Sequence, residues 1–281
     1  MDVLDTPSAM TNWARGRERH GVIGLVPTMG FLHEGHASLM RRLRPLCDHL
    51  VVSIFVNPLQ FGPDEDLDRY PRDPEGDLAM CERESVDAVF MPPDLYPDGF
   101  ATQVAVHGLT DGLCGAGRPG HFEGVTTVVA RLFGLTRCRV STFGEKDFQQ
   151  LMVLRRMVED LALPVRIVPA PLVRDPDGLA MSSRNKYLSD EQRRRGLTLH
   201  RALHRIADAV DGGKTDVAAM VAAALATIES DGVEYLEVVD ARSLSPLEQI
   251  GDAPARALVA ARYGATRLID NVAVGTPLSW D

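Results

Sequence analysis

The chain has 281 residues, 45% of them hydrophobic and 25% charged, which is the composition of an ordinary globular protein. Its length allows one large α/β domain or two unequal domains. The formal net charge of −9 argues against a broad nucleic-acid-binding surface, so we expect no nucleic-acid partner. The sequence contains no signal-peptide core and no membrane-length apolar run, so we expect a cytoplasmic protein without a membrane partner. The four cysteines form no CxxC motif, and we expect free thiols.

The first predicted helix covers residues 8–20 and the first predicted strand residues 22–26. A glycine-containing turn and a second helix follow in the segment Gly24–His36, and apolar residues at helical spacing extend this helix to Leu46. A helix that starts directly after a strand presents free backbone N–H groups, which favour a bound phosphate. His33 and His36 are three residues apart, so they share one side of the first turn if both are helical.

The HxGH spacing of these histidines resembles the HIGH signature of the adenylyl-transferring superfamily. That superfamily includes class I aminoacyl-tRNA synthetases and small nucleotidyltransferases. A strand–glycine–helix junction also occurs in many α/β domains without such a function, and the signature alone does not identify a substrate.

A second buried strand is predicted over residues 50–56, and the polar residues Asn57 and Gln60 follow it. Open α/β sheets bind ligands at the carboxyl ends of their strands, so these two side chains are candidates for hydrogen bonds to a small polar substrate. Without such a role they would be ordinary turn residues.

The next segment contains several short predicted elements. We expect a charged loop, a helix, two strands, a glycine-rich loop and a helix, over residues 64–73, 77–84, 88–91, 103–106, 112–124 and 125–135. Long loops of this kind tend to be functional. Arg118 and His121 are the residues of the glycine-rich loop that can meet an anion.

The strand–turn–helix pattern recurs where a predicted strand over residues 139–142 runs into Phe143–Gln150 (FGEKDFQQ). Lys146 can reach a phosphate, Asp147 can accept from a ribose hydroxyl or lie near a metal, and Gln150 can contact substrate. Charged residues are also common in the first turn of a helix simply because they suit its dipole.

A fifth strand is predicted over residues 165–168, and the segment Val173–Asn185 follows it. Here Ser182 and Ser183 stand beside Arg184, and hydroxyls next to a guanidinium make a compact phosphate clamp. A serine-rich loop before a helix is the alternative. Resemblance to the KMSKS loop, which accompanies HIGH elsewhere in the superfamily, favours the clamp.

From residue 186 the pattern changes to two amphipathic helices and three strand-like runs. The helices are expected around residues 199–210 and 217–228, the second capped by Thr215 or Asp216, and the strands over 235–239, 257–261 and 266–269. We therefore predict an α/β fold with two domains. Residues 1–185 form a Rossmann-like parallel-sheet nucleotide-binding domain, and residues 186–281 form a smaller α+β C-terminal lid domain.

Five motifs together resemble the pantothenate synthetase (pantoate–beta-alanine ligase) family. They are PTMGFLHEGH at Pro27–His36, FVNPLQF at Phe55–Phe61, RPGHFEG at Arg118–Gly124, FGEKDFQQ at Phe143–Gln150 and GLAMSSRN at Gly178–Asn185. Arg267–Asn271 (RLIDN) also looks like the family. Five motifs in the expected order are far more specific than any one of them.

The resemblance implies a two-step ligase reaction, in which ATP and pantoate give pantoyl adenylate and beta-alanine then gives pantothenate. It implies ATP and Mg²⁺ as cofactors and a homodimer joined through the first domain. His36 is implied as proton donor, and His33, Lys146, Ser182, Ser183 and Arg184 as phosphate or charge-stabilising residues. The further ATP contacts implied are Met29, Gly30, Phe31, Leu32, Glu34, Gly35, Gly144, Glu145, Asp147, Val173 and Met181. Gln60 and Gln150 are implied as substrate contacts, with Asn57, Arg118 and His121 nearby.

Two positions depart from the family pattern. Phe31 stands where a small residue is usual, and Gly76 precedes Asp77 where some members carry two acidic residues that help to hold the metal. We therefore assign no protein ligand to Mg²⁺. Two alternatives are a nucleotidyltransferase that stops at an adenylated or cytidylylated product and a nucleotide-binding regulatory module without catalysis. The QxF and GEKDxQQ motifs argue against the first, and the intact charged motif residues argue against the second.

Overall fold

A computed structural model describes residues 1–280 and contains two compact units. The first unit comprises Met1–Thr110, Arg118–Glu145 and Gln150–Pro171, and the second comprises Asp111–Gly117, Lys146–Gln149 and Leu172–Asp281. The predicted division at residue 185 stays a prediction, and the compact units divide the chain differently. No helix in residues 1–280 is both long enough and apolar enough to cross a membrane.

The first unit is built on a six-stranded parallel sheet in the order β1-β4-β3-β2-β5-β6. The strands are β1 (Asp2–Leu4), β2 (Ile23–Thr28), β3 (His49–Ile54), β4 (Ala88–Phe90), β5 (Val140–Gly144) and β6 (Arg166–Ala170). The central strands are almost entirely buried, as expected for a parallel sheet covered on both faces. This confirms the predicted parallel α/β sheet.

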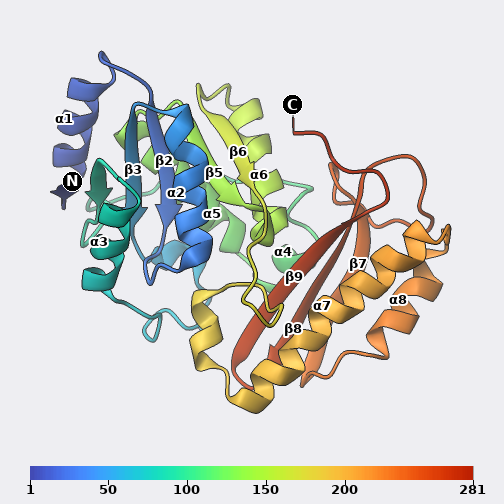
Figure 1. Ribbon diagram of the computed structural model, residues 1–281. Coiled ribbons are helices and arrows are strands. Elements are labelled where there is room, and N and C mark those ends of the chain that lie inside the picture. The colour runs from blue at the N-terminus through green and yellow to red at the C-terminus, as the bar shows by residue number, and fades with distance from the viewer. Residues whose placement is uncertain (281) are drawn as a thin grey trace. The chain divides into compact units, whose positions relative to one another are not determined.

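Helices cover both faces of this sheet (Figure 1). They are α1 (Pro7–Arg17), α2 (Glu34–Leu43), α3 (Pro74–Arg83), α5 (His121–Thr136) and α6 (Phe148–Asp160). On one face Met40 and Leu43 of α2 and Cys81 of α3 share a buried cluster with Leu50 and Val52 of β3. Alternation along β3 turns Val51 to the opposite face.

The second unit has a three-stranded antiparallel sheet in the order β7-β8-β9, formed by β7 (Gly232–Asp240), β8 (Ala255–Tyr263) and β9 (Thr266–Val274). Helices α7 (Asp190–Asp211) and α8 (Val217–Leu225) pack on one face, where Leu203 and Met220 share one apolar cluster with Val259 and Leu268. This confirms the predicted small α+β unit. Asp216, one of the two predicted capping residues, is the N-cap of α8.

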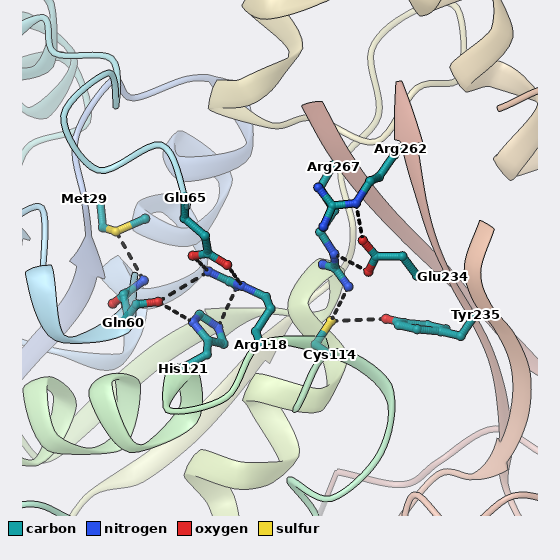
Figure 2. Close-up of polar contacts among 10 residues, drawn as sticks. All are labelled: Met29, Gln60, Glu65, Cys114, Arg118, His121, Glu234, Tyr235, Arg262 and Arg267. Carbon is teal, nitrogen blue, oxygen red and sulfur yellow. Dashed lines mark hydrogen bonds and ion pairs between the residues drawn. The ribbon is translucent and has the colours of Figure 1, made fainter. Parts of the chain in front are cut away.

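The short helix α4 (Leu113–Gly117) also belongs to the second unit. The Cys114 thiol lies 3.1 Å from the Tyr235 hydroxyl and accepts from the Arg267 guanidinium at 3.5 Å (Figure 2). Gln149 accepts from the Cys114 N–H and donates to the Gly112 carbonyl, both at 2.9 Å. These bonds attach α4 to β7 and β9 on one side and to the 146–149 segment on the other.

Several predicted elements were wrong in detail. The strand expected over residues 103–106 is absent, because side chains of α5 bond the backbone of Val104 in place of a neighbouring strand. Thr127 accepts from the Val104 N–H, and Thr126 donates to the Val104 carbonyl. The expected loop over residues 112–124 contains α4 and the first turn of α5. Helix α2 ends at Leu43 and residues Arg44–Leu46 form a 3₁₀ turn, since Pro45 cannot continue an α-helix.

Candidate active site

The carboxyl ends of three adjacent strands, β3, β2 and β5, carry three of the predicted motifs. After β2 the chain builds the sheet toward β3 and β4, and it then returns to the other side of β2 with β5. The boundary between β2 and β5 is therefore the topological switch point, where open α/β sheets bind their ligands. The segments that leave this edge begin at Met29 after β2, at Asn57 close after β3 and at Glu145 after β5.

Asp77 holds the turn that follows β2. Its carboxylate accepts from the Phe31 N–H at 2.9 Å and from the Leu32 N–H at 2.6 Å. Gly30 has φ 84°, and a Cβ there would lie 2.9 Å from Asp77 Oδ2, so the close approach requires glycine. Phe31 has φ 51°, a conformation that is strained for a bulky residue. Burial raises the pKa of Asp77 even though the two amides lower it.

His33 and His36 form a reciprocal cap at the start of α2. His33 is the N-cap in extended conformation, and its Nδ1 accepts from the Gly35 N–H at 3.1 Å. His36 is the third helical residue, and its Nδ1 accepts from the His33 N–H at 3.2 Å. The condition that both histidines are helical is met by His36 and not by His33, because an N-cap has non-helical backbone. The two rings still lie together, with centroids 4.1 Å apart.

Gln60 is held beside this turn by a buried amide. Asn57, only 1% exposed, donates to Gln60 Oε1 at 3.0 Å and to the Gly124 carbonyl at 3.1 Å. Its own oxygen accepts from the Tyr96 hydroxyl at 2.7 Å. Gln60 Nε2 lies 3.3 Å from Met29 Sδ, which joins the segments after β2 and β3. The sequence prediction that Asn57 and Gln60 lie at one sheet edge is consistent with this geometry.

Arg118, His121 and Glu65 hold the backbone of the same turn (Figure 2). The Arg118 guanidinium donates to both Glu65 oxygens at 2.6 and 2.7 Å and to His121 Nε2 at 2.9 Å. His121 Nδ1 donates to the Gln60 carbonyl at 2.9 Å. Arg118 and His121 were expected in a loop able to meet an anion. In the structure His121 begins α5, and Arg118 forms an ion pair with Glu65.

We expect the Glu65→Gln variant to be less stable than the wild-type chain at neutral pH, and this difference to shrink in acid. Burial raises the Glu65 pKa, but the Arg118 hydrogen bonds and charge bring it below its ordinary value of 4.5. A carboxylate whose folded pKa is lowered contributes stability above the unfolded pKa and loses it as pH falls through the folded pKa. Urea unfolding at pH 7 and at about pH 3.5 measures this change. An equal difference at both pH values would contradict the ion-pair role.

We expect Gly124→Ala to displace the Gln60 turn. A Cβ at Gly124 would lie 2.2 Å from the Leu59 carbonyl oxygen and 2.6 Å from the Gln60 N, both backbone atoms. Overpacking of this kind costs about 1–3 kcal/mol. Gly134→Ala in the same helix is the matched control, because a Cβ there meets no atom within 4 Å and alanine favours the helix by about 1 kcal/mol. Thermal melts should therefore move in opposite directions, and a stable Gly124→Ala would refute the close contact.

The second unit carries the other predicted phosphate-binding residues. Lys146 lies in the 3₁₀ turn Glu145–Asp147, with its ammonium 3.5 Å from Asp147 Oδ1. Ser182 caps the 3₁₀ helix Ser183–Tyr187 by accepting from the Arg184 N–H at 3.3 Å. Ser183 is buried and Arg184 half-buried. The serine–arginine motif thus begins a 3₁₀ helix, and its role as a phosphate clamp stays a prediction.

The predicted site residues divide between the two units. The first unit holds Met29, Gly30, Phe31, Leu32, His33, Glu34, Gly35, His36, Asn57, Gln60, Arg118, His121, Gly144, Glu145 and Gln150. The second unit holds Lys146, Asp147, Val173, Met181, Ser182, Ser183 and Arg184. Within residues 1–280 no three His, Cys, Asp or Glu side chains gather in a group that could hold a metal ion.

Sequence reasoning missed the residues that support these motifs. Glu65, Tyr96 and Gly124 support Gln60, and Asp77 supports the turn after β2, although the sequence had suggested only a metal role for Asp77. Asn271 donates to the Lys146 carbonyl at 2.9 Å, and its motif had been noted without a role. Each contact joins residues far apart in the chain, so no local pattern signals it.

Known proteins share this sequence and fold. The family described as Pantoate-beta-alanine ligase matches residues 2–273. A pantothenate synthetase of Heliobacterium modesticaldum is 51% identical over 280 residues, covering 98% of this chain and 99% of the relative. A pantothenate synthetase of Moorella thermoacetica is 51% identical over 278 residues, covering 97% of this chain and 98% of the relative.

Solved structures agree with the fold over nearly the whole chain. The crystal structure of pantothenate synthetase from Thermus thermophilus superposes with a TM-score of 0.92 at 46% identity, covering 98% of this chain and 100% of that one. The pantoate-beta-alanine ligase of Francisella tularensis, solved in complex with beta-gamma ATP and beta-alanine, gives a TM-score of 0.82 at 30% identity and covers 97% of each chain. The match in sequence, fold and motif order shows that this chain belongs to the pantoate–beta-alanine ligase family.

Proposed function

We propose that the chain condenses pantoate with beta-alanine, using ATP and giving pantothenate, AMP and pyrophosphate. The observation that carries this proposal is the β2–β3 edge. The turn after β2 leads to a helix start with two imidazoles, and Gln60, held by Asn57, contacts Met29 of that turn. A helix N-terminus suits a phosphate, and an amide suits a small polar acid. The Francisella relative, whose structure is a complex with beta-gamma ATP and beta-alanine, supports the same substrates here.

In the first step a pantoate carboxylate oxygen attacks the α-phosphorus of ATP. The new O–P bond forms as the bond to the β-phosphate breaks, and pyrophosphate leaves with the electron pair. His33, His36, Lys146 and Arg184 donate to the phosphate oxygens, and Ser182 and Ser183 add hydroxyl donors. Fixed donors aimed at developing charge lower the barrier without reorganising during the reaction.

In the second step the neutral amine of beta-alanine attacks the acyl carbon of pantoyl adenylate. A C–N bond forms, the C–O bond to AMP breaks, and the amine loses a proton to solvent or product phosphate. Gln60 and Gln150 orient the pantoyl group, with Asn57 holding the Gln60 amide at 3.0 Å. Orientation of this kind converts a bimolecular attack into an effectively unimolecular one.

Mg²⁺ enters this proposal with ATP, because phosphate oxygens and water are the ligands that this hard cation prefers. Asp77 supports the turn after β2, because each of its carboxylate oxygens accepts a backbone N–H group of that turn. We also propose a cytoplasmic homodimer joined through the first domain, with no nucleic-acid partner. Sedimentation velocity of the purified chain tests the dimer.

Pyrophosphate release tests the reaction. We expect release with Mg-ATP and pantoate together, and accumulation of AMP and pantothenate once beta-alanine is added. Folded protein that binds ATP but releases no pyrophosphate with pantoate would refute the proposal. Release that ignores beta-alanine, with an adenylated product accumulating, would instead indicate a nucleotidyltransferase.

A further inference from the structure

A buried asparagine on β9 holds the turn that carries Lys146. Asn271, 4% exposed, donates from Nδ2 to the Lys146 carbonyl at 2.9 Å. The bond fixes the backbone at the residue whose ammonium is proposed to meet phosphate. It joins positions 125 residues apart in the sequence, so its geometry depends on the folded unit.

Arg256 of β8 keeps the Asn271 side chain in place. Its Nε donates to Asn271 Oδ1 at 2.8 Å, and Arg256 is itself 6% exposed. The same guanidinium lies 4.2 Å from the centre of the Phe148 ring, within the range of a cation–π interaction. The Lys146 segment is therefore held at two points: Asn271 bonds the Lys146 carbonyl, and Arg256 contacts the ring of Phe148.

The preceding residue of β9 holds a second proposed nucleotide-binding segment. Asp270 is 4% exposed, and its carboxylate forms a bidentate ion pair with the Arg174 guanidinium, which donates to its two oxygens at 2.7 and 2.9 Å. Arg174 also donates to the Gly178 carbonyl at 3.1 Å and forms an antiparallel bridge with Ala180. This small hairpin leads directly into Ser182.

Asp270 and Asn271 project to opposite faces of the sheet, because successive residues of a strand alternate. Leu268 and Val272, which share the Asp270 face, pack against the α7–α8 cluster. Asn271 shares the other face with Arg256, consistent with the register that pairs Asn271 with Leu258 and Ala273 with Arg256. One dipeptide thus holds a different segment on each side of β9.

We propose that Asp270 and Asn271 are positioning residues that fix the Lys146 turn and the Val173–Arg184 segment in one relative arrangement. The inference rests on the proposed function, in which both segments bind the phosphates of ATP. Asn271 acts through Lys146, and Asp270 acts through the hairpin before Ser182. Neither side chain needs to touch substrate, since misplacement of a donor by about 1 Å can cost 10²-fold in rate.

The test replaces the donor of Asn271 and follows pyrophosphate release. Asn271→Asp keeps an oxygen for Arg256 but sets a carboxylate oxygen against the Lys146 carbonyl, and Asn271→Ala removes both bonds without adding charge. We expect kcat to fall up to about 10²-fold, with the KM for beta-alanine nearly unchanged. Val259→Ala, which removes buried methyl groups from β8, is the control for general loss of stability and should retain kcat.

A double-variant comparison separates positioning from mere stability. In a Lys146→Met background, Asn271→Ala should cost little further rate, because the group that it positions is already gone. Asp270→Asn, on the neighbouring residue, should keep its full effect in that background. A full, additive loss from Asn271→Ala, or no loss in the wild-type background, would overturn the inference. If Lys146→Met alone retains full activity, the proposed role of Lys146 fails instead.

Discussion

We expect the His36→Gln variant to release pyrophosphate about 10²–10³ times more slowly than the wild-type chain, the usual loss when one transition-state donor is removed. His36 is the third residue of α2, and its Nδ1 accepts from the His33 N–H. Glutamine at this position can make the same capping bond. The variant therefore removes the imidazole while the capping hydrogen bond to the His33 N–H is kept.

Two control measurements separate a catalytic effect of His36→Gln from a loss of stability. The thermal melting temperature of His36→Gln should match that of the wild-type chain, and His20→Gln, a change at an exposed histidine of the same unit, should leave the rate unchanged. A normal rate of pyrophosphate release by His36→Gln would remove His36 from the mechanism. A fall in both rate and melting temperature would show that the cap had been lost.

Replacing Lys146 with methionine should have an effect of similar size, about 10²–10³ in kcat, since it removes the cation that the proposed mechanism assigns to the developing phosphate charge. Methionine keeps most of the length and apolar contacts of the lysine stem. The Lys146 carbonyl still accepts from Asn271, so the turn should keep its backbone position. Single-turnover formation of pantoyl adenylate measures the affected step directly.

The matched control is Lys214→Met, at an exposed position of the same unit. It makes the identical chemical change, so any effect on net charge or solubility should be shared. We expect its kcat to equal that of the wild-type chain. A loss in Lys146→Met that appears only in the second step, with normal adenylate formation, would contradict the proposed contact with ATP phosphates.

Elements with strong periodicity could be predicted from sequence. Strand β3 is a nearly continuous apolar run, and its predicted ends differ from the observed ones by only one or two residues. Helix α7 repeats Leu199, Leu203 and Ile206 at helical spacing, so its apolar core was found although its polar first two turns were not. Strand β1 was missed because its three residues pair at the edge of the sheet and are mostly exposed. Short edge strands carry no alternating apolar signal.

The prediction failed where tertiary contacts replaced a local rule. The run over residues 103–106 alternates like a strand, yet Thr126 and Thr127 of α5 satisfy the backbone of Val104. Helix α4 forms in a glycine-rich stretch of low helix propensity. The Gln149 side chain stabilises its start by hydrogen bonds to the Cys114 N–H and to the carbonyl of Gly112, just before the helix. A side chain that comes from a distant segment leaves no mark in the local pattern.

The site motifs could be found from sequence, but their supports could not. The histidines, Gln60, Lys146 and the serine–arginine loop stand out by residue type and spacing. Asp77 and Asn271 act on backbone atoms 45 and 125 residues away, so only the folded units reveal them. Arg118 looked available for an anion in the sequence and instead forms an ion pair with Glu65.

The reciprocal cap on α2 also determines the tautomer of both histidines. Each Nδ1 accepts a backbone N–H, so in each neutral ring the proton must reside on Nε2. Both rings then present an N–H bond dipole, and neither Nε2 can serve as a base. In the proposed mechanism the helix start therefore offers the ATP phosphates two neutral N–H donors rather than two cations.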